Sequence, residues 1–484
     1  MGLLQSIGGG RHADRTPVAI IGAGALGEHL AKALRGPLDL GFEPLFLVDR
    51  DGLAKGSSVA GLRVYDADKD IDAIRRRHIQ EVIIALPELS GEELAKLYQR
   101  YASLGCRVRL YESSENAGNG TQRSVVRDFT IEDLLSLKAR DYTEPGVEDA
   151  YEGRTILITG GAGMVGSELC RRLAKARPER LIVLDTSESS VYSLQQALLR
   201  TYGRELKFQA VIGSVRDGKC LEGLFHHYRP EIVFHAATHR HVSLMERNGP
   251  EAIKNNVFGT RTLAEYAEAY HTERFLLIST DKAVRPASIV GASMRLAEMV
   301  IEAHEKSATY FGSIRFGNIL DGSGSVLDLF HQQIASGGPV TIPDSHATRF
   351  LVSAAEAAHL ILKSALLAQR GNVFFLDLDK PVQLQFLAMN TIRIAGLDPE
   401  TDVPIRVTGL APGEKLHSEL FHDPHHVTGT DDPRIFVEHG YTVSPEELSI
   451  RLTLLSDTIA NEGNLRSVLR RVLPDYEPNY IISH

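Results

Sequence analysis

The sequence predicts an α/β protein with two domains, each built on a doubly wound parallel sheet. Two segments, 17–50 and 154–185, share the order strand, glycine turn, helix and second strand, and both second strands reach an aspartate. Further short apolar strands alternate with helical segments, which is typical of a parallel sheet with helices on both faces. The length of 484 residues also exceeds what one ordinary core supports, so we expect two Rossmann-like domains.

The pattern divides the chain into two domains and three shorter segments. The first domain is close to average domain size, and the segment after it loses the regular alternation of strands and helices. The last segment is expected to be helical and peripheral. The predicted parts are a flexible arm at 1–16, the first Rossmann-like domain at 17–115, a connector at 116–151, the second domain at 152–440 and a C-terminal helical tail at 441–484.

Composition argues against several classes of protein. The 53 basic and 62 acidic residues give a net charge of −9, whereas a nucleic-acid-binding protein usually has a basic excess. The three cysteines are widely spaced, which favours a reduced, cytoplasmic setting and disfavours a thiolate metal site. Because the chain has no run of about eighteen apolar residues, we expect a soluble protein.

The first glycine turn has GxGxxG spacing, with Gly22, Gly24 and Gly27 between a strand at 18–21 and an amphipathic helix. The next strand ends at Asp49, where a dinucleotide-binding unit keeps an acid for a ribose hydroxyl. The pattern indicates either a bound nucleotide or a scaffold whose glycines only let the helix pack closely on the strand. The sequence leaves both interpretations open.

The second glycine turn predicts a dinucleotide site more strongly. Gly160, Gly163 and Gly166 follow a strand at 155–159, and the next strand ends at Asp185. Such glycines let backbone amides approach a pyrophosphate, whose charge is favoured at a helix N-terminus. The carboxylate of Asp185 would repel a 2′-phosphate, and no arginine directly follows it to bind one. We therefore expect NAD rather than NADP.

Polar side chains gather in an elbow, residues 279–282, after a buried strand. Thr280, Asp281 and Lys282 occupy consecutive positions, and a helix begins beyond Pro286. Catalytic groups gather at strand ends of open α/β sheets, and a hydroxyl, an acid and a base together can serve proton transfer. The alternative is a loop whose polar residues only cap the next helix.

Two further segments contain polar residues. The stretch 235–241 carries three histidines, but no carboxylate stands at zinc-like spacing, so we expect polar lining and no metal. Downstream, Asn318, Ser325 and Arg349 can hold a pyrophosphate or a sugar, because arginine binds phosphate oxygens in forked geometry. The same segment is equally well interpreted as a glycine-rich connector without a binding role.

Taken together, the motifs of residues 130–440 resemble those of the extended short-chain dehydrogenase/reductases, and within them the UDP-N-acetylglucosamine 4,6-dehydratases of polysaccharide biosynthesis. They occur in the family's order: TGGAGMVGSEL, LDTSE, HAATHRHVSLME, NNVFGT, STDKAV, RLAE, RFGNIL, GSV, TRF and TGLAPGEKL. The resemblance implies an extended short-chain dehydrogenase fold with a small C-terminal substrate-binding part. The first domain resembles the one that precedes the catalytic domain in longer members, and we expect a soluble form without their transmembrane region.

The resemblance implies a reaction on a UDP-sugar. NAD on the second glycine turn takes a hydride from sugar C4, a base removes the C5 proton, water leaves from C6, and the hydride returns to C6. Thr280, Asp281 and Lys282 would supply the hydrogen bond to the 4-hydroxyl and the acid/base steps. The product is a 4-keto-6-deoxy sugar, and a homo-oligomer is expected by analogy.

The family's motifs also assign binding residues by position. The expected cofactor-binding residues are Gly160, Gly163, Met164, Val165, Gly166, Asp185, Ser187, Ser214, Val215, Ala236, Ala237 and Met294. The expected substrate-binding residues are His241, Asn318, Ser325, Val326, Arg349 and Lys415.

Several positions depart from the family's pattern. On the helix after the elbow, where the family has Met and Lys, this sequence has Val290 and Met294. The family's lysine holds the nicotinamide ribose and assists proton loss, and a thioether does neither. Smaller departures are Ser214, where the family has an acid near the adenine, and Arg240, where it has a lysine.

Three hypotheses therefore stay open. The first is a dehydratase that relies wholly on the elbow. The second is a related NAD-dependent epimerase or oxidoreductase of nucleotide sugars with altered hydride chemistry. The third is a non-catalytic subunit that binds NAD or a nucleotide sugar, although such a subunit would have no need of the acid and base of the elbow.

Overall fold

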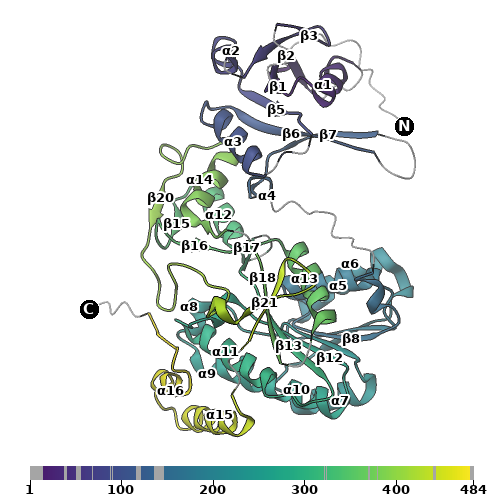
Figure 1. Cartoon of the computed structure of the whole chain (residues 1–484), viewed down its shortest axis with the longest axis vertical. Helices are drawn as coiled ribbons and strands as arrows, with labels where there is room; N and C mark the ends of the chain where they lie inside the picture. The colour runs from purple at the N-terminus through teal and green to yellow at the C-terminus, as the bar shows by residue number, and fades with distance from the viewer. Residues whose placement is uncertain are drawn as a thin grey trace, which may run out of the picture. The chain divides into compact units, whose positions relative to one another are not determined.

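The chain folds into two compact units (Figure 1). Unit 1 comprises Met1–Lys138 and Met389–Val403, and unit 2 comprises Ala139–Ala388 and Pro404–His484. The structure is a computed structural model that describes residues 15–36, 41–50, 56–67, 69–87, 89, 91–115, 122–135, 146–320, 322, 324–368, 371–378, 380–439 and 443–479.

Within the described part of unit 1, one sheet has the strand order β3-β4-β2-β1-β5-β6-β7. The central strands are parallel, while β3 and β7 pair antiparallel at the two edges. The strands are β1 Thr16–Ile21, β2 Phe42–Asp49, β3 Ser58–Val59, β4 Leu62–Asp66, β5 Glu81–Ile84, β6 Arg107–Glu115 and β7 Gln122–Asp128. The helices are α1 Ala25–Arg35, α2 Asp70–Arg76, α3 Gly91–Ala102 and α4 Ile131–Leu134.

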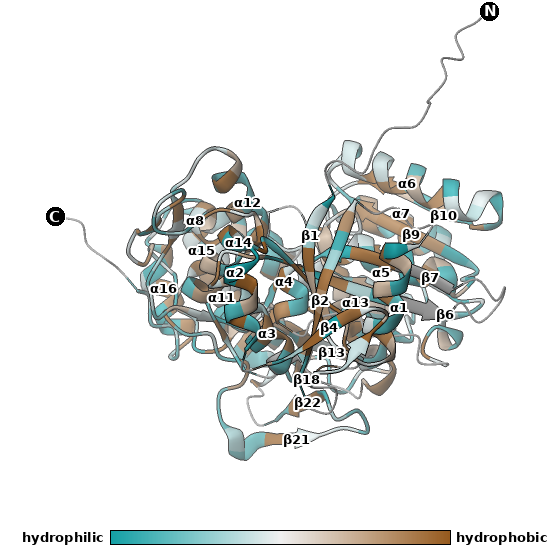
Figure 2. Ribbon diagram, turned by 90° about the horizontal axis from the view of Figure 1, so that it is seen from above, coloured by the Kyte–Doolittle hydropathy of each residue, from teal (hydrophilic) through white to brown (hydrophobic). Residues whose placement is uncertain are grey.

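Hydrophobic residues run along β1 and β2, whereas exposed helices such as α6 (Glu188–Tyr202) mix both kinds (Figure 2). This difference follows from burial, because a strand inside a parallel sheet is covered on both faces. It explains why the strands of this protein were readable as short apolar runs.

The predicted connector at 116–151 is wrong in part. Residues of β7 pair with β6 from Arg109↔Asp128 to Glu115↔Gln122, so this stretch belongs to the first sheet. β7 has the sequence QRSVVRD and lies at the sheet edge, where charged residues are common. An edge strand of this composition lacks the apolar run by which the inner strands were recognised.

Within the described part of unit 2, the main sheet has the order β10-β9-β8-β11-β12-β13-β18-β22-β21. The strands from β10 to β18 are parallel, and β22 and β21 extend the sheet antiparallel. The strands of this sheet are β8 Thr155–Thr159, β9 Arg180–Asp185, β10 Phe208–Ile212, β11 Ile232–His235, β12 Arg274–Ile278, β13 Tyr310–Arg315, β18 Asn372–Leu376, β21 Val427–Gly429 and β22 Ile435–Glu438.

The strand order reverses between β8 and β11, which are neighbours in the sheet although β9 and β10 lie between them in the chain. In open α/β sheets, ligands bind in the crevice outside the carboxyl ends of the strands at such a point. The fold prediction of a doubly wound parallel sheet is therefore confirmed for both units. The second glycine turn follows β8 and therefore lies at the carboxyl ends of the strands, where ligands are expected to bind.

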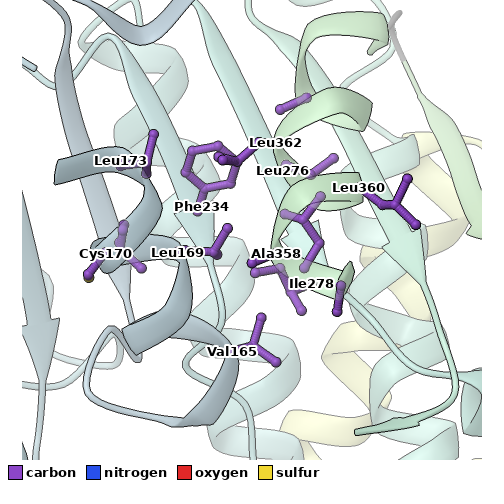
Figure 3. Packing of buried hydrophobic residues seen from close by; sticks show 14 of the residues in the cluster. Val165, Leu169, Cys170, Leu173, Phe234, Leu276, Ile278, Ala358, Leu360 and Leu362 are labelled. Atoms are coloured by element: carbon purple, nitrogen blue, oxygen red, sulfur yellow. The ribbon is translucent and has the colours of Figure 1, made fainter. Parts of the chain in front are cut away.

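Helices cover both faces of this sheet and form its core. On one face α5 (Met164–Lys175) and α13 (Ala354–Leu367) pack against the strands, with Leu169, Phe234, Leu276 and Leu360 in one buried cluster (Figure 3). The other described helices of unit 2 include α7 Gly218–Tyr228, α8 Val242–Met245, α9 Gly249–Ile253, α10 Thr260–Ala269, α11 Ile289–Glu302, α12 Val326–Ala335 and α14 Leu384–Ile394, the last of which spans the division between units.

The C-terminal segment is helical as predicted, but it is not peripheral. Helices α15 (Pro445–Ala460) and α16 (Leu465–Val472) share a buried cluster with α9 and α11, and Figure 1 shows them beside these helices. Every residue of α11 is buried in consequence. The apolar face of the tail has the ordinary helical period, so the sequence could not tell which surface it covers.

Candidate active site

The elbow, residues 279–282, follows β12 and is tied to the neighbouring strand β13. Ser279 N donates to Ile314 O at 2.8 Å, and Asp281 N donates to Phe316 O at 3.0 Å. These bonds continue the parallel pairing beyond the end of β12. The backbone of the elbow is therefore positioned by the sheet itself, which is more precise than a free loop.

The side chains of the elbow form one hydrogen-bonded group. Lys282 Nζ donates to Asp281 Oδ1 at 3.2 Å and to Asn318 Oδ1 at 3.1 Å. The Thr280 hydroxyl donates to the same Asp281 oxygen at 2.9 Å. Because Asp281 is 2% exposed and the Lys282 side chain is 31% exposed, the carboxylate lies behind the ammonium and the hydroxyl.

The surroundings of Asp281 favour its charged form. Burial acts to raise the pKa of this carboxyl, but the Lys282 ammonium and hydrogen bonds from Ser418, Thr280 and Lys282 outweigh burial and lower it below its ordinary value. Asp281 is thus a carboxylate at neutral pH. Its hydrogen bond from the Thr280 hydroxyl gives a path by which it can accept a proton.

The glycines of the second turn allow neighbouring segments of backbone to pack closely. Gly160 has a φ of +65°, and a Cβ there would lie 2.6 Å from the carbonyl carbon of Ala236. A Cβ at Gly166 would lie 2.3 Å from Gly160 O, so helix α5 can approach the strand only without a side chain. Gly163 is the N-cap of α5, whose first amides face the end of the sheet. This arrangement fits a pyrophosphate group.

Asp185, at the end of β9, is held by two backbone amides. Ala162 N donates to Oδ2 at 3.1 Å, and Ser187 N donates to Oδ1 at 2.9 Å. Each carboxylate oxygen still has a lone pair, so a pair of ribose hydroxyls can donate to it. The position of this carboxylate beside the glycine turn fits the ribose that adjoins a pyrophosphate.

A cavity of about 800 Å³ brings the glycine turn and the elbow together. It lies wholly within unit 2. Its volume is large enough for a drug-sized ligand or for part of a dinucleotide. The predicted site residues that line it are Thr280, Lys282, Gly160, Gly163, Met164, Val165, Gly166, Asp185, Ser214, Val215, Ala236, Ala237, Met294, His241, Asn318, Ser325 and Val326.

Four predicted residues do not line the cavity. Asp281 lies behind Lys282, as described above, and the Ser187 hydroxyl donates to Ser190 Oγ at 2.8 Å on the outer side of the turn. Arg349 is 8% exposed and donates to backbone carbonyls at Thr348 and Leu416. Lys415 Nζ donates to Val284 O at 2.5 Å. Arg349 and Lys415 support the site's backbone in this structure.

The two cavity residues on helix α11, beyond the elbow, are apolar. Val290 and Met294 line the cavity, and they are 0% and 2% exposed. Met294 packs in a buried cluster with Leu277, Ala283 and Ala297. Position 294 therefore contributes an uncharged side chain to the cavity.

The histidines of 235–241 do not gather around one point. His235 is buried between the hydroxyls of Thr159 and Thr260, at 2.7 and 2.8 Å, and burial lowers its pKa to about 3. His241 lines the cavity, and burial followed by the charges of Arg240 and His239 lowers its pKa. The described residues contain no cluster of three or more His, Cys, Asp or Glu side chains placed to hold a metal.

Sequence reasoning missed a buried charge cluster beneath the elbow. The Ser279 hydroxyl donates to Glu298 Oε1 at 2.6 Å, and Arg315 binds both oxygens of Glu298 at 2.7 Å. Arg315 also reaches Glu438 at 2.5 Å, and His422 Nδ1 lies 3.0 Å from the same Glu438 oxygen. In the sequence, Glu298 and Arg315 stand out only as members of the family motifs RLAE and RFGNIL. The motifs do not indicate that the two side chains form an ion pair.

The first glycine turn, in unit 1, has the same local plan. Gly22 has a φ of +123°, and a Cβ at Gly27 would lie 1.9 Å from Gly22 O, so both are needed for packing. Gly24, by contrast, has nothing within 4 Å of a built Cβ. Asp49 ends β2 as expected. Whether a nucleotide binds here stays a prediction.

The fold and the site together define an α/β protein in which a glycine turn and a hydrogen-bonded group of polar side chains line one cavity. The chain matches the family described as polysaccharide biosynthesis protein over residues 156–439, and residues 6–111 match a family described as CoA-binding domain. The chain therefore belongs to the polysaccharide biosynthesis protein family, and the assignment to extended short-chain dehydrogenase/reductases of polysaccharide biosynthesis is confirmed.

Similar proteins extend the match beyond one domain. The chain is 37% identical over 412 residues to capsular polysaccharide biosynthesis protein CapD of Staphylococcus aureus, which covers 84% of this chain and 69% of CapD. It is 37% identical over 404 residues to probable polysaccharide biosynthesis protein EpsC of Bacillus subtilis (strain 168), covering 83% and 67%. The X-ray structure of Pen from Bacillus thuringiensis matches 61% of this chain and 92% of Pen, with 28% identity and a TM-score of 0.55. No helix among the described residues is long and apolar enough to span a membrane.

Proposed function

We propose that this protein is an NAD-dependent nucleotide-sugar 4,6-dehydratase that converts UDP-N-acetylglucosamine to a 4-keto-6-deoxy sugar. The observation that carries the proposal is the shared cavity. The glycine turn at 160–166, Thr280 and Lys282 line it, and Asn318 accepts a hydrogen bond from Lys282 within it. Membership of a polysaccharide biosynthesis family supports a nucleotide-sugar substrate.

The residues of the second glycine turn fit NAD. When bound, NAD would accept a hydride from C4 of the sugar and return it to C6. The turn amides would hold the pyrophosphate, and Asp185 would accept hydrogen bonds from the adenosine ribose. Ser214 and Val215 line the same cavity and would lie along the adenosine half.

The elbow would carry the proton transfers. Thr280 would hold the sugar 4-hydroxyl and take up its proton through its hydrogen bond to Asp281. After C4 becomes a ketone, the C5 proton is acidic, and one of Asp281 and Lys282 would remove it while the other protonates the C6 hydroxyl, which leaves as water. When the hydride returns to C6, the pair would give a proton back to C5, so the two protons taken from the 4-hydroxyl and C5 equal the two given to the C6 hydroxyl and C5. The 3.2 Å contact between the two groups allows the proton to pass between them, so the pair ends each cycle as it began.

A second candidate function is an NAD-dependent epimerase or oxidoreductase of nucleotide sugars. The observation that favours it is the apolar surface of Val290 and Met294, because a cavity without a cation at position 294 handles the hydride step differently. An epimerase returns the hydride to C4 and loses no water. The mass of the product therefore separates the two functions.

The test is incubation of the purified protein with NAD and UDP-N-acetylglucosamine in deuterated water, followed by mass spectrometry. A dehydratase gives a product lighter by one water with deuterium at C5. A product of unchanged mass but altered stereochemistry would favour the epimerase. Unchanged sugar after long incubation at high enzyme would exclude the dehydratase for this substrate and leave a non-catalytic binding role.

A further inference from the structure

The last described residues of the chain lie against the candidate site rather than on a free surface. Glu477 N donates to Pro286 O at 3.0 Å, and Asn479 N donates to Ala287 O at 3.3 Å. These two bonds connect backbone to backbone. They attach residues 476–479, here named the C-terminal strap, to the loop at 284–288 through which the elbow enters α11.

The strap also holds a second loop of the site. Gly413 N donates to Asn479 O at 3.2 Å, and Asn479 Nδ2 donates to Glu414 O at 3.1 Å. Glu414 lines the cavity, and Lys415 Nζ in turn donates to Val284 O. Asn479 thus makes hydrogen bonds to both loops at once, with its backbone and its side chain.

The two loops need an external restraint because their conformations are uncommon. Arg285 has a φ of +36°, a left-handed conformation that a residue with a side chain adopts only when its surroundings hold it. Gly413 has a φ of +81°, and a Cβ there would lie 2.8 Å from the Ser288 Cβ. The loops are therefore packed closely against each other, although about 125 residues separate them in the chain.

The residues that precede the strap are packed in the core. Helix α16 ends at Val472 and packs in the buried cluster of α11, and Arg466 of α16 donates to Glu246 at 3.0 Å. Tyr476 is 2% exposed and belongs to the same cluster. A segment anchored in this way can hold the loops beyond it in place without itself being part of the catalytic group.

We propose that the C-terminal strap positions the substrate side of the cavity, and that Asn479 is its principal positioning residue. The proposal rests on the proposed function for the identity of the substrate. The strap holds the 284–288 loop and Glu414 but makes none of the described hydrogen bonds to the glycine turn. Its loss should weaken the binding of the nucleotide sugar while leaving NAD affinity within about twofold.

Two variants test the proposal in the otherwise full chain. One ends after Tyr476 and lacks the four strap bonds, and the other is Asn479→Ala, which lacks only the side-chain bond to Glu414. The KM for UDP-N-acetylglucosamine is expected to rise about 10- to 100-fold in the first and about 3- to 10-fold in the second, since one hydrogen bond contributes about 0.5–1.5 kcal/mol. The value of kcat should change less than KM.

Asn461→Ala is the matched control, because Asn461 lies in the same tail at the end of α15 and its side-chain amide donates to a backbone carbonyl, Asp457 O, as that of Asn479 donates to Glu414 O. It should lower the melting temperature slightly without changing KM. A chain that ends after Asn479 keeps all four strap bonds and serves as the control for shortening. Equal KM values for Asn479→Ala and the unaltered chain would overturn the role of Asn479.

Amide hydrogen exchange gives a readout that does not depend on the substrate. Exchange at 284–291 and 411–415 should accelerate in the chain that ends after Tyr476, while exchange in β8 and α5 stays the same. Unchanged exchange in both loops would overturn the positioning role. Failure of the unaltered chain to bind UDP-N-acetylglucosamine would instead overturn the proposed function, so the two failures are distinct.

Discussion

The two halves of the stretch from Thr280 to Met294 line one cavity but have opposite character. Thr280 and Lys282 form hydrogen bonds with a buried carboxylate, and the sheet positions them. Val290 and Met294 present hydrocarbon and a thioether to the same space; both are buried, and Met294 packs in an apolar cluster. The comparison shows that a hydrogen-bonded group of polar side chains and a pair of uncharged, buried side chains contribute to the same cavity.

The largest expected effect is at the polar half. Lys282→Ala removes the ammonium that contacts Asp281 and Asn318, so kcat should fall by about 10²–10⁴-fold. The affinity for UDP-N-acetylglucosamine, measured by calorimetry with NAD present, should stay nearly the same. Lys306→Ala, at a position outside the cavity, is the control for a lost lysine. A large loss of affinity with little loss of rate would make Lys282 a binding residue.

The buried charge cluster supports the polar half, so breaking it should cost stability. Glu298→Gln leaves Arg315 and Arg295 with one fewer buried carboxylate, and the free energy of unfolding should fall by about 3–5 kcal/mol. Glu273→Gln is the matched control, because its pair with Arg154 is exposed and should contribute about 1 kcal/mol or less. Urea unfolding measures both. Equal losses in the free energy of unfolding would mean that the buried cluster contributes no more to stability than the exposed pair.

The apolar half is tested by restoring a cation. Met294→Lys should raise either NAD affinity or kcat by about tenfold, because an ammonium there would lie near the nicotinamide ribose. The free energy of unfolding should fall at the same time, since Met294 is 2% exposed among apolar residues. Met294→Leu keeps the volume and should change neither property. If Met294→Lys also changes neither, another group has taken over this part of the site.

The smallest expected effect is a dependence of stability on pH through His422. Burial acts to lower the pKa of His422, but its hydrogen bonds to the Asp475 and Glu438 carboxylates outweigh burial and raise the pKa above its ordinary value. A group with a raised folded-state pKa contributes stability that is complete below its unfolded pKa and is lost as pH rises through the folded value. His422→Gln should therefore be less stable than the unaltered chain near about pH 5, with the gap narrowing as the pH rises above the ordinary histidine pKa of about 6.5. A gap that does not change with pH would show that His422 does not titrate in this range.

The fold was largely predictable because its signals are local. Gly160, Gly166 and Asp185 stand within one strand–helix–strand unit, and their spacing reports the turn, the close packing and the acid together. The same holds for the elbow, where three chemical groups are adjacent in the chain. β7 escaped prediction because an edge strand with alternating charges lacks an apolar run.

The sequence alone determined which residues are present at the two turns and at the elbow, and that Val290 and Met294 replace the family's Met and Lys. Only the tertiary structure decided how they are held. Arg315 pairs with Glu438 across 123 positions, and Asn479 bonds to Ala287 and Glu414, from a segment that the sequence pattern placed on the periphery. Periodicity and spacing report interactions within an element, whereas these contacts depend on which distant elements pack together, and no local pattern encodes that choice.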